Sequence, residues 1–209
     1  MKTITEVIAL FPATQPQQWR QHKNGKGWVF EKAHADQTAL IEGVVSGDAR
    51  VYGNARVSGN ARVYGNAWVY GNAQVSGDAQ VYGNAWVSGD AQVSGDAQVY
   101  GNARVYGNAW VYGDARMSGN ARMSGNARVY GNAWVFSPLY IQGTRHSITL
   151  CSFTEIAIGC HVHTISFWKK EYKKIGAEEG YSKVEIKEYF EYITLLANAA
   201  KRFSKTAAK

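Results

Sequence analysis

The residues of this chain that could carry acid–base or metal chemistry are concentrated toward its C-terminal end. The 209-residue sequence contains five histidines and two cysteines. Imidazole and thiolate groups bind zinc, and imidazole also serves as a general base. His22 and His34 lie near the N-terminus, far in the sequence from the other candidates. The remaining candidates fall within one short segment: His146, Cys151, Cys160, His161 and His163.

The spacing of these candidates leaves three interpretations open. If the stretch CHVHT is a strand, His161 and His163 share one of its faces. The arrangement C-x8-C-H-x-H lacks the paired short spacings of established zinc sites. This favours the interpretation that these histidines and cysteines only pack a terminal cap. The alternatives are a structural zinc on Cys160, His161 and His163, or a catalytic site that uses His146, His161 and His163. We expect no cofactor.

The elements that would have to position these side chains are dominated by a six-residue repeat. From Val45 to Trp134 the pattern V-[YS]-G-[ND]-A-[RQW] runs through fifteen units without an insertion, and only Met117 and Met123 replace the valine. The units contain no histidine, cysteine, glutamate or lysine. Because they offer neither a general base nor a loop that could form a lid, we do not expect catalysis within the repeat.

Each repeat unit predicts a short strand followed by a tight turn. The four residues Ala-x-Val-x alternate with a period of two, which places alanine and valine on one face. Gly-Asn or Gly-Asp forms the turn, since glycine accepts a positive φ and Asn or Asp tolerates it better than most residues. Identical turns bend the chain in one sense, so three units make a coil. The predicted fold class is mainly β, a three-sided parallel β-helix with five regular coils.

The segments before and after the repeat are predicted to cover the two ends of the β-helix. A degenerate form of the repeat begins at Val29, so we expect the β-helix to span residues 29–135 and residues 1–28 to cap its first end.

After the β-helix, the segments RHSITLC and TEIAIGC alternate like strands, and helices are expected over about 165–175 and 182–203. Ser182 and Glu185 form a capping box for the second helix. Its predicted apolar face contains Ile186, Tyr189, Phe190, Ile193, Ala197 and Ala200. Residues 136–209 are thus predicted to form a strand and α-helical cap that could mediate oligomerisation.

The repeat resembles the hexapeptide repeat of left-handed parallel β-helix proteins, where an aliphatic residue is followed four positions later by a small one. That family includes acyltransferases and gamma-class carbonic anhydrases. The resemblance implies left-handed coils, trimeric assembly and, for an acyltransferase, a histidine general base at a subunit seam, here His146, His161 or His163. A carbonic-anhydrase-like site needs three histidines that converge from the coils, and this sequence departs from that pattern.

Nearly the whole chain also resembles a family of phage and prophage hexapeptide proteins. The matching features are degenerate SGNARVYGN repeats, the segment IGC-x-x-H-T that contains Cys160 and His163, and an aromatic-rich helical tail. Such proteins are commonly labelled as transferases on the repeat alone. The resemblance implies a phage or prophage origin.

Aromatic side chains are expected to form ladders on the outside of the coil, because residues eighteen apart lie one above the other. Two faces stand out. The Trp face carries Arg50, Tyr52, Trp68, Tyr70, Trp86 and Arg104, and the Tyr face carries Tyr64, Tyr82 and Tyr100. Such ladders stabilise a sheet whether or not they bind a partner. Rigid aromatic area with interspersed arginine is also enriched in binding surfaces.

The sequence therefore predicts a binding protein without catalytic activity. The expected partner is another protein, such as a host defence factor, and the chain is expected to form a homo-oligomer, with a trimer favoured. A hexapeptide acyltransferase with an inter-subunit histidine site is the alternative. Arginine beside tryptophan also suits single-stranded nucleic acid. Aspartates at the corners interrupt the arginines, however, so nucleic acid is the less favoured partner.

Composition and charge indicate where such a protein would act. The formal net charge is +7, of which +4 lies in residues 136–209, and its diffuse spread is typical of ordinary solubility. The apolar run Val7 to Phe11 is short for a signal peptide, and no segment is long enough to span a bilayer. Two cysteines are too few to staple the fold. The sequence predicts a cytoplasmic protein with no membrane partner.

Overall fold

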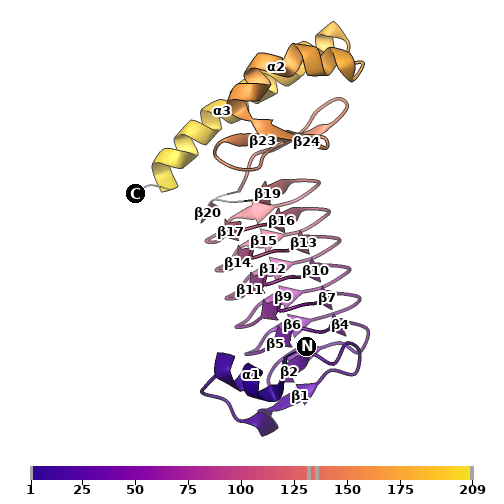
Figure 1. The fold of residues 1–209 in the computed structure, drawn as a ribbon, viewed down its shortest axis with the longest axis vertical. Coiled ribbons are helices and arrows are strands. Elements are labelled where there is room, and N and C mark those ends of the chain that lie inside the picture. The colour runs from indigo at the N-terminus through magenta and orange to yellow at the C-terminus, as the bar shows by residue number, and fades with distance from the viewer. Residues whose placement is uncertain (1, 131–132, 135–136, 208–209) are drawn as a thin grey trace.

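The six-residue repeat folds into a three-sided coil. The computed structural model describes residues 2–130, 133–134 and 137–207. Strands pair in parallel with the strand eighteen residues later, so that Trp68 lies beside Trp86 and Val69 beside Val87. Every third strand joins the same sheet, and the coils stack into a column (Figure 1). The predicted fold class is confirmed as a β-solenoid of parallel sheets with helices at its C-terminal end.

The solenoid strands are two or three residues long, shorter than the four that the pattern predicts, because the corners take the other positions. The eight-stranded sheet contains β1 (Trp19–Gln21), β2 (Trp28–Phe30), β5 (Val44–Val45), β8 (Arg62–Val63), β11 (Gln80–Val81), β14 (Gln98–Val99), β17 (Arg116–Met117) and β20 (Ala133–Trp134). One six-stranded sheet contains β3 (His34–Ala35), β6 (Arg50–Val51), β9 (Trp68–Val69), β12 (Trp86–Val87), β15 (Arg104–Val105) and β18 (Arg122–Met123). The other contains β4 (Leu40–Ile41), β7 (Arg56–Val57), β10 (Gln74–Val75), β13 (Gln92–Val93), β16 (Trp110–Tyr112) and β19 (Arg128–Tyr130).

The inside of the coil is filled by the alanine and valine of each unit, as predicted. Val93 and Ala91, for example, are both fully buried, whereas Gln92 between them is exposed. Alternation of this kind follows from the period of two along a strand. The core is therefore one continuous apolar column along the solenoid.

The corners depend on glycine alone for the left-handed backbone. Gly83 has a φ of 69°, and a Cβ placed there would lie 3.0 Å from the backbone nitrogen of Gly101 one coil later. The expectation that Asn or Asp would share this conformation was wrong, because Lys26 is the only positive-φ residue besides glycine in the described chain. The asparagines instead form side-chain ladders, in which the Nδ2 of Asn84 donates to the Oδ1 of Asn102 at 3.3 Å. The corner at 131–132 and Val135 lie outside the described residues.

The N-terminal end carries a helix that the sequence interpretation missed. Helix α1 (Ile4–Leu10) and the short 3-10 helix η1 (Pro16–Gln18) precede β1, which pairs antiparallel with β2. Thr3 and Glu6 form a capping box at the start of α1. Val7 packs with Trp19 and Val44 in a small separate core. In Figure 1, α1 lies beside the first coils of the solenoid.

The C-terminal end is covered by an antiparallel sheet and two helices (Figure 1). The sheet contains β21 (Tyr140–Gln142), β22 (Ser147–Leu150), β23 (Glu155–Ile158) and β24 (His161–Thr164). The amide of Tyr130, in the last described coil, donates to the carbonyl of Cys151 at 3.0 Å. Ile148 and Leu150 are fully buried in the same core as the solenoid valines. The cap is therefore an extension of the solenoid core.

Helices α2 (Ile165–Glu178) and α3 (Lys183–Ala207) pack on this sheet. The predicted capping box is present: the amide of Glu185 donates to the hydroxyl of Ser182, and the Glu185 carboxylate accepts from the Ser182 amide at 2.7 Å. Phe190 was wrongly placed on the buried face, since it is 36% exposed and stacks on Tyr172. Leu196 occupies the core instead and is fully buried. No helix in the described ranges is long and apolar enough to cross a bilayer.

The Tyr189 hydroxyl fastens α3 to the hairpin between β21 and β22. It accepts from the amides of His146 at 2.6 Å and Arg145 at 3.1 Å, and it donates to the carbonyl of His146 at 2.7 Å. Tyr189→Phe leaves the amides of Arg145 and His146 without this acceptor, whereas the His146 carbonyl still accepts from the Gly143 amide at 3.2 Å. We therefore expect a loss of about 1–3 kcal/mol in the free energy of unfolding. Chemical denaturation would measure it. Tyr172→Phe, on the adjacent helix, is the control and should cost less than half as much.

Candidate functional site

The structure buries one of the histidines and cysteines that the sequence places in one segment and leaves the others nearer the surface of the cap. Cys151 is buried, its thiol approaches the carbonyl of Glu155 at 3.4 Å, and burial raises the pKa of this thiol to about 12. Cys160 is exposed. His161 and His163 both lie on β24, as predicted, with ring centroids 6.2 Å apart. The cluster is thus divided between the interior of the cap and its surface.

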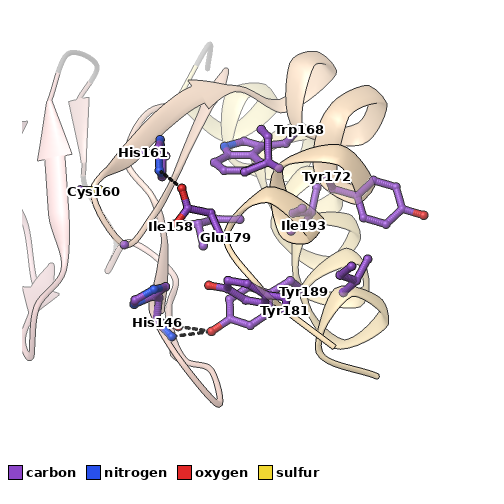
Figure 2. A pocket seen from close by; sticks show the side chains of 14 residues that line it. His146, Ile158, Cys160, His161, Trp168, Tyr172, Glu179, Tyr181, Tyr189 and Ile193 are labelled. Atoms are coloured by element: carbon purple, nitrogen blue, oxygen red, sulfur yellow. Dashed lines mark hydrogen bonds and ion pairs between the residues drawn. The ribbon is translucent and has the colours of Figure 1, made fainter. Parts of the chain in front are cut away.

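A pocket of about 250 Å³ lies between the cap sheet and the two helices (Figure 2). His146, Cys160 and His161 line one wall, and the Nε2 of His161 lies 3.3 Å from a carboxylate oxygen of Glu179. Most of the remaining wall is apolar or aromatic: Ile158, Trp168, Tyr172, Ile175, Tyr181, Ile186, Tyr189 and Ile193. Burial raises the pKa of the Tyr181 phenol to about 12.

His163 is not among the residues that line this pocket. Its ring packs on Phe167 at 4.2 Å and on Trp168 at 5.2 Å between centroids. Of the three histidines proposed for an acyltransferase site, His146 and His161 line this pocket, and His163 lies beside His161 but outside the pocket lining. Within the described residues, no three His, Cys, Asp or Glu side chains are grouped so that they could hold a metal ion.

Metal analysis tests the weak zinc candidates directly. Because His161 is engaged by Glu179 and His163 by aromatic rings, we expect the purified protein to contain far less than one zinc per chain by plasma mass spectrometry. One zinc per chain that disappears in a His161→Ala, His163→Ala double variant would establish the metal site instead.

The Trp face contains a stacked tryptophan pair held between two arginines. The rings of Trp68 and Trp86 are 5.3 Å apart at their centroids, with an interplanar angle of 12°. The guanidinium of Arg50 lies 4.9 Å from the Trp68 ring, and that of Arg104 lies 4.8 Å from the Trp86 ring. Both tryptophans are half-buried, so each still presents part of its ring to solvent.

Two tyrosines extend this aromatic surface. Tyr52 makes an edge contact with Trp68 at 6.2 Å, and Tyr70 makes one with Trp86 at 6.4 Å. The ring and cation contacts of the two tryptophans in the described chain are thus all to residues of the same face. The sheet below fixes the backbone of every member. The Trp face is therefore a preorganised aromatic and basic surface.

The Tyr face is also a regular ladder, but one end of it is occupied. Tyr64 stacks on Tyr82 at 4.8 Å, and Tyr82 stacks on Tyr100 at 4.9 Å, each with an interplanar angle of 3°. Phe11, which follows α1, contacts the ring of Tyr64 at 6.5 Å. Because the N-terminal segment packs on this ladder, the Trp face is the more available of the two.

Comparison with known families concerns the repeat. The model of the YdcK beta solenoid repeat matches residues 45–59, 49–63, 55–71, 61–77, 73–89, 79–95, 97–113 and 121–136. The chain is a β-solenoid repeat protein. Comparisons with the curated proteins and with the solved structures gave no match. All the residues of the Trp face lie within the matched segments, so this surface is built on the β-solenoid itself.

The sequence predicted the Trp face but not the pocket in the cap. The six residues predicted for the Trp face do form one surface, because the eighteen-residue period fixes their columns. The cap pocket was missed, since Glu179 and Tyr181 reach it from the turn between two helices whose packing the repeat does not determine. The apolar spacing in α3 was the only available signal, because Tyr189 and Ile193 line the pocket.

Proposed function

We propose that this β-solenoid is a phage- or prophage-derived protein without catalytic activity that binds another protein through the Trp face. The stacked pair Trp68 and Trp86, held between Arg50 and Arg104, is the observation that supports the proposal most. Tryptophan, tyrosine and arginine are the side chains that most often contribute large parts of the binding energy at protein interfaces.

The rigidity of this surface favours binding. The rings have few torsions to lose, and the sheet already holds them, so association costs little conformational entropy. Arg50, Trp68, Trp86, Arg104 and Arg122 form one column, since each is the first residue of a strand in the same sheet. The three arginines of this column have no ion pair within 4 Å in the described chain. A partner with acidic side chains around an apolar centre would complement this face. A host factor such as a defence component is the class of partner that the phage resemblance suggests.

Self-association is part of the same proposal. Related hexapeptide proteins are commonly trimers, and the cap of antiparallel sheet and helices offers exposed apolar side chains, among them Leu195, which is 50% exposed. We propose a homo-oligomer, with a trimer favoured, that presents one Trp face per subunit. Light scattering on the purified full chain gives the mass that tests this assembly.

Affinity purification tests the partner proposal. The tagged full chain and a Trp68→Ala, Trp86→Ala bait would be passed over bacterial extract, and captured proteins would be quantified by mass spectrometry. A Tyr82→Ala, Tyr100→Ala bait is the matched control, since it removes a stacked pair of similar geometry from the other face. The proposal expects a protein that is captured by wild type and by the control but lost from the tryptophan variant. Equal capture by all three baits contradicts it.

An acyltransferase remains the second candidate, favoured by the position of His146 and His161 in one pocket. In such an enzyme a histidine would act as the general base that deprotonates the acceptor. Acetyl-CoA turnover against a panel of amines and hydroxyl compounds tests it. Turnover that is lost in His161→Ala and in His146→Ala would favour the enzyme over the binder.

A further inference from the structure

The Trp face contains a gap in its tyrosine column. At the position two residues after Trp68, Trp86 and Arg104, the column reads Tyr70, Ser88 and Tyr106 over three successive coils. Strands of one sheet lie about 4.8 Å apart, so the backbones of Tyr70 and Tyr106 are separated by roughly twice that distance. The serine between them supplies no ring.

The missing ring leaves a slot at the level of Ser88, between the levels of Tyr70 and Tyr106. On the Tyr face, where no ring is missing, neighbouring rings stack at 4.8 and 4.9 Å. A ring at the level of Ser88 would therefore lie one coil from each tyrosine, where it could stack on Tyr106 and meet Tyr70, whose ring is turned 78° from the plane of Trp86. Tyr106, whose neighbours eighteen residues away on both sides are serines, is 43% exposed. A hollow of about 260 Å³ is present here, and the side chains that line it include Tyr70, Trp86, Ser88, Arg104, Tyr106 and Arg122.

One side of the slot is cationic. Arg104 and Arg122 are directly paired on neighbouring strands, and their guanidinium groups make no ion pair within 4 Å in the described part of the chain. Arg104 lies over Trp86, which holds its side chain beside the slot. Two arginines on paired strands concentrate positive charge, and an anion that accepts hydrogen bonds from both would be favoured there.

We propose that this slot binds a mononucleotide. The base enters between Tyr70 and Tyr106, above the hydroxyl of Ser88, and the phosphate is held by Arg104 and Arg122. Stacking on aromatic side chains and phosphate recognition by arginine are the usual elements of nucleotide binding. The site goes beyond the proposed protein-binding function and does not depend on it.

A free nucleotide fits this site better than a nucleic acid strand. Two arginines lie on adjacent coils, whereas the next one in the column, Arg50, lies three coils from Arg104. The corner beside the slot carries a carboxylate, Asp90, whose Oδ1 accepts from the side-chain Nδ2 of Asn72 at 3.0 Å. A strand would have to pass this charge, while a single phosphate on the arginine side does not.

Isothermal titration of AMP into the purified full chain tests the proposal. We expect a dissociation constant between about 10 µM and 1 mM, the range typical of a ligand of this size in an open site. Adenosine, which lacks the phosphate, should bind at least tenfold more weakly. The double variant Arg104→Gln, Arg122→Gln should reduce AMP affinity to that of adenosine.

Ser88→Tyr is the sharpest variant, because it fills the slot with the side chain that the repeat carries at this position elsewhere. It should keep or raise the melting temperature and weaken AMP binding at least tenfold. Ser76→Tyr makes the same change on another face and should leave AMP binding unaltered. Absence of saturable AMP binding, or binding that Ser88→Tyr leaves unchanged, overturns the proposal. Tight binding of an oligodeoxyadenylate without AMP binding also overturns it. Ser88→Tyr retains Trp68 and Trp86, so protein capture should persist and the two proposals fail separately.

Discussion

Val93→Asp is expected to lower the free energy of unfolding by at least about 4 kcal/mol, or to prevent folding altogether. Val93 is fully buried in the column of alanine and valine. Among the described residues of this column, a carboxylate would find only backbone donors that are already paired in the sheet. The introduced group must be buried either charged or protonated and unpaired, and both are costly. Thermal and urea denaturation followed by circular dichroism would measure the loss.

Gln92→Asp provides the matched comparison, one residue away in the same strand. Gln92 points outward and is exposed, so its replacement should cost less than about 1 kcal/mol, mostly from the lower strand preference of aspartate. Similar losses of stability in the two variants would show that the alternation of inward and outward residues is wrong.

The double variant Trp68→Ala, Trp86→Ala is expected to weaken binding of the captured partner by about 2 kcal/mol or more, which is roughly a thirtyfold rise in the dissociation constant. The rings are half-buried and lie outside the apolar column, so the fold should persist with a modestly lower melting temperature from the lost stacking. The affinity would be measured by calorimetry and the oligomer mass by light scattering, each beside a thermal melt.

Tyr82→Ala, Tyr100→Ala again serves as the control for loss of a stacked pair. If the tryptophan variant keeps its affinity and mass and loses only thermal stability, the ladder reinforces the sheet and does nothing more. The binding surface would then have to be sought on the Tyr face or on the basic helical tail.

How far the sequence determines this structure can be judged from particular residues. The solenoid could be predicted because every unit repeats the same local choices: Val93 and Ala91 inside, Gln92 outside and Gly95 at the corner. A strict period also fixes which residues eighteen apart are neighbours. The stack of Trp68 on Trp86 is therefore predictable without any knowledge of tertiary packing.

The ends of the solenoid could not be predicted in the same way. Helix α1 is short, and only the capping box of Thr3 and Glu6 marks its start. The cap pocket depends on how α2 and α3 dock on an irregular sheet, and Glu179 meets His161 only after that docking. The gap at Ser88 is partly predictable. Its position in the tyrosine column follows from the sequence, but the proposed binding site also depends on where Arg104 and Arg122 lie in the fold.

Hydroxyl-radical footprinting of the complex tests the central claim, that the Trp face binds a protein, without changing any residue. Side-chain oxidation would be mapped by mass spectrometry on the solenoid alone and with its purified partner. The account predicts that oxidation of Trp68, Trp86 and Tyr70 falls severalfold in the complex, while oxidation of Tyr82 and Tyr100 stays the same. Unchanged oxidation of both tryptophans in a saturated complex would contradict it.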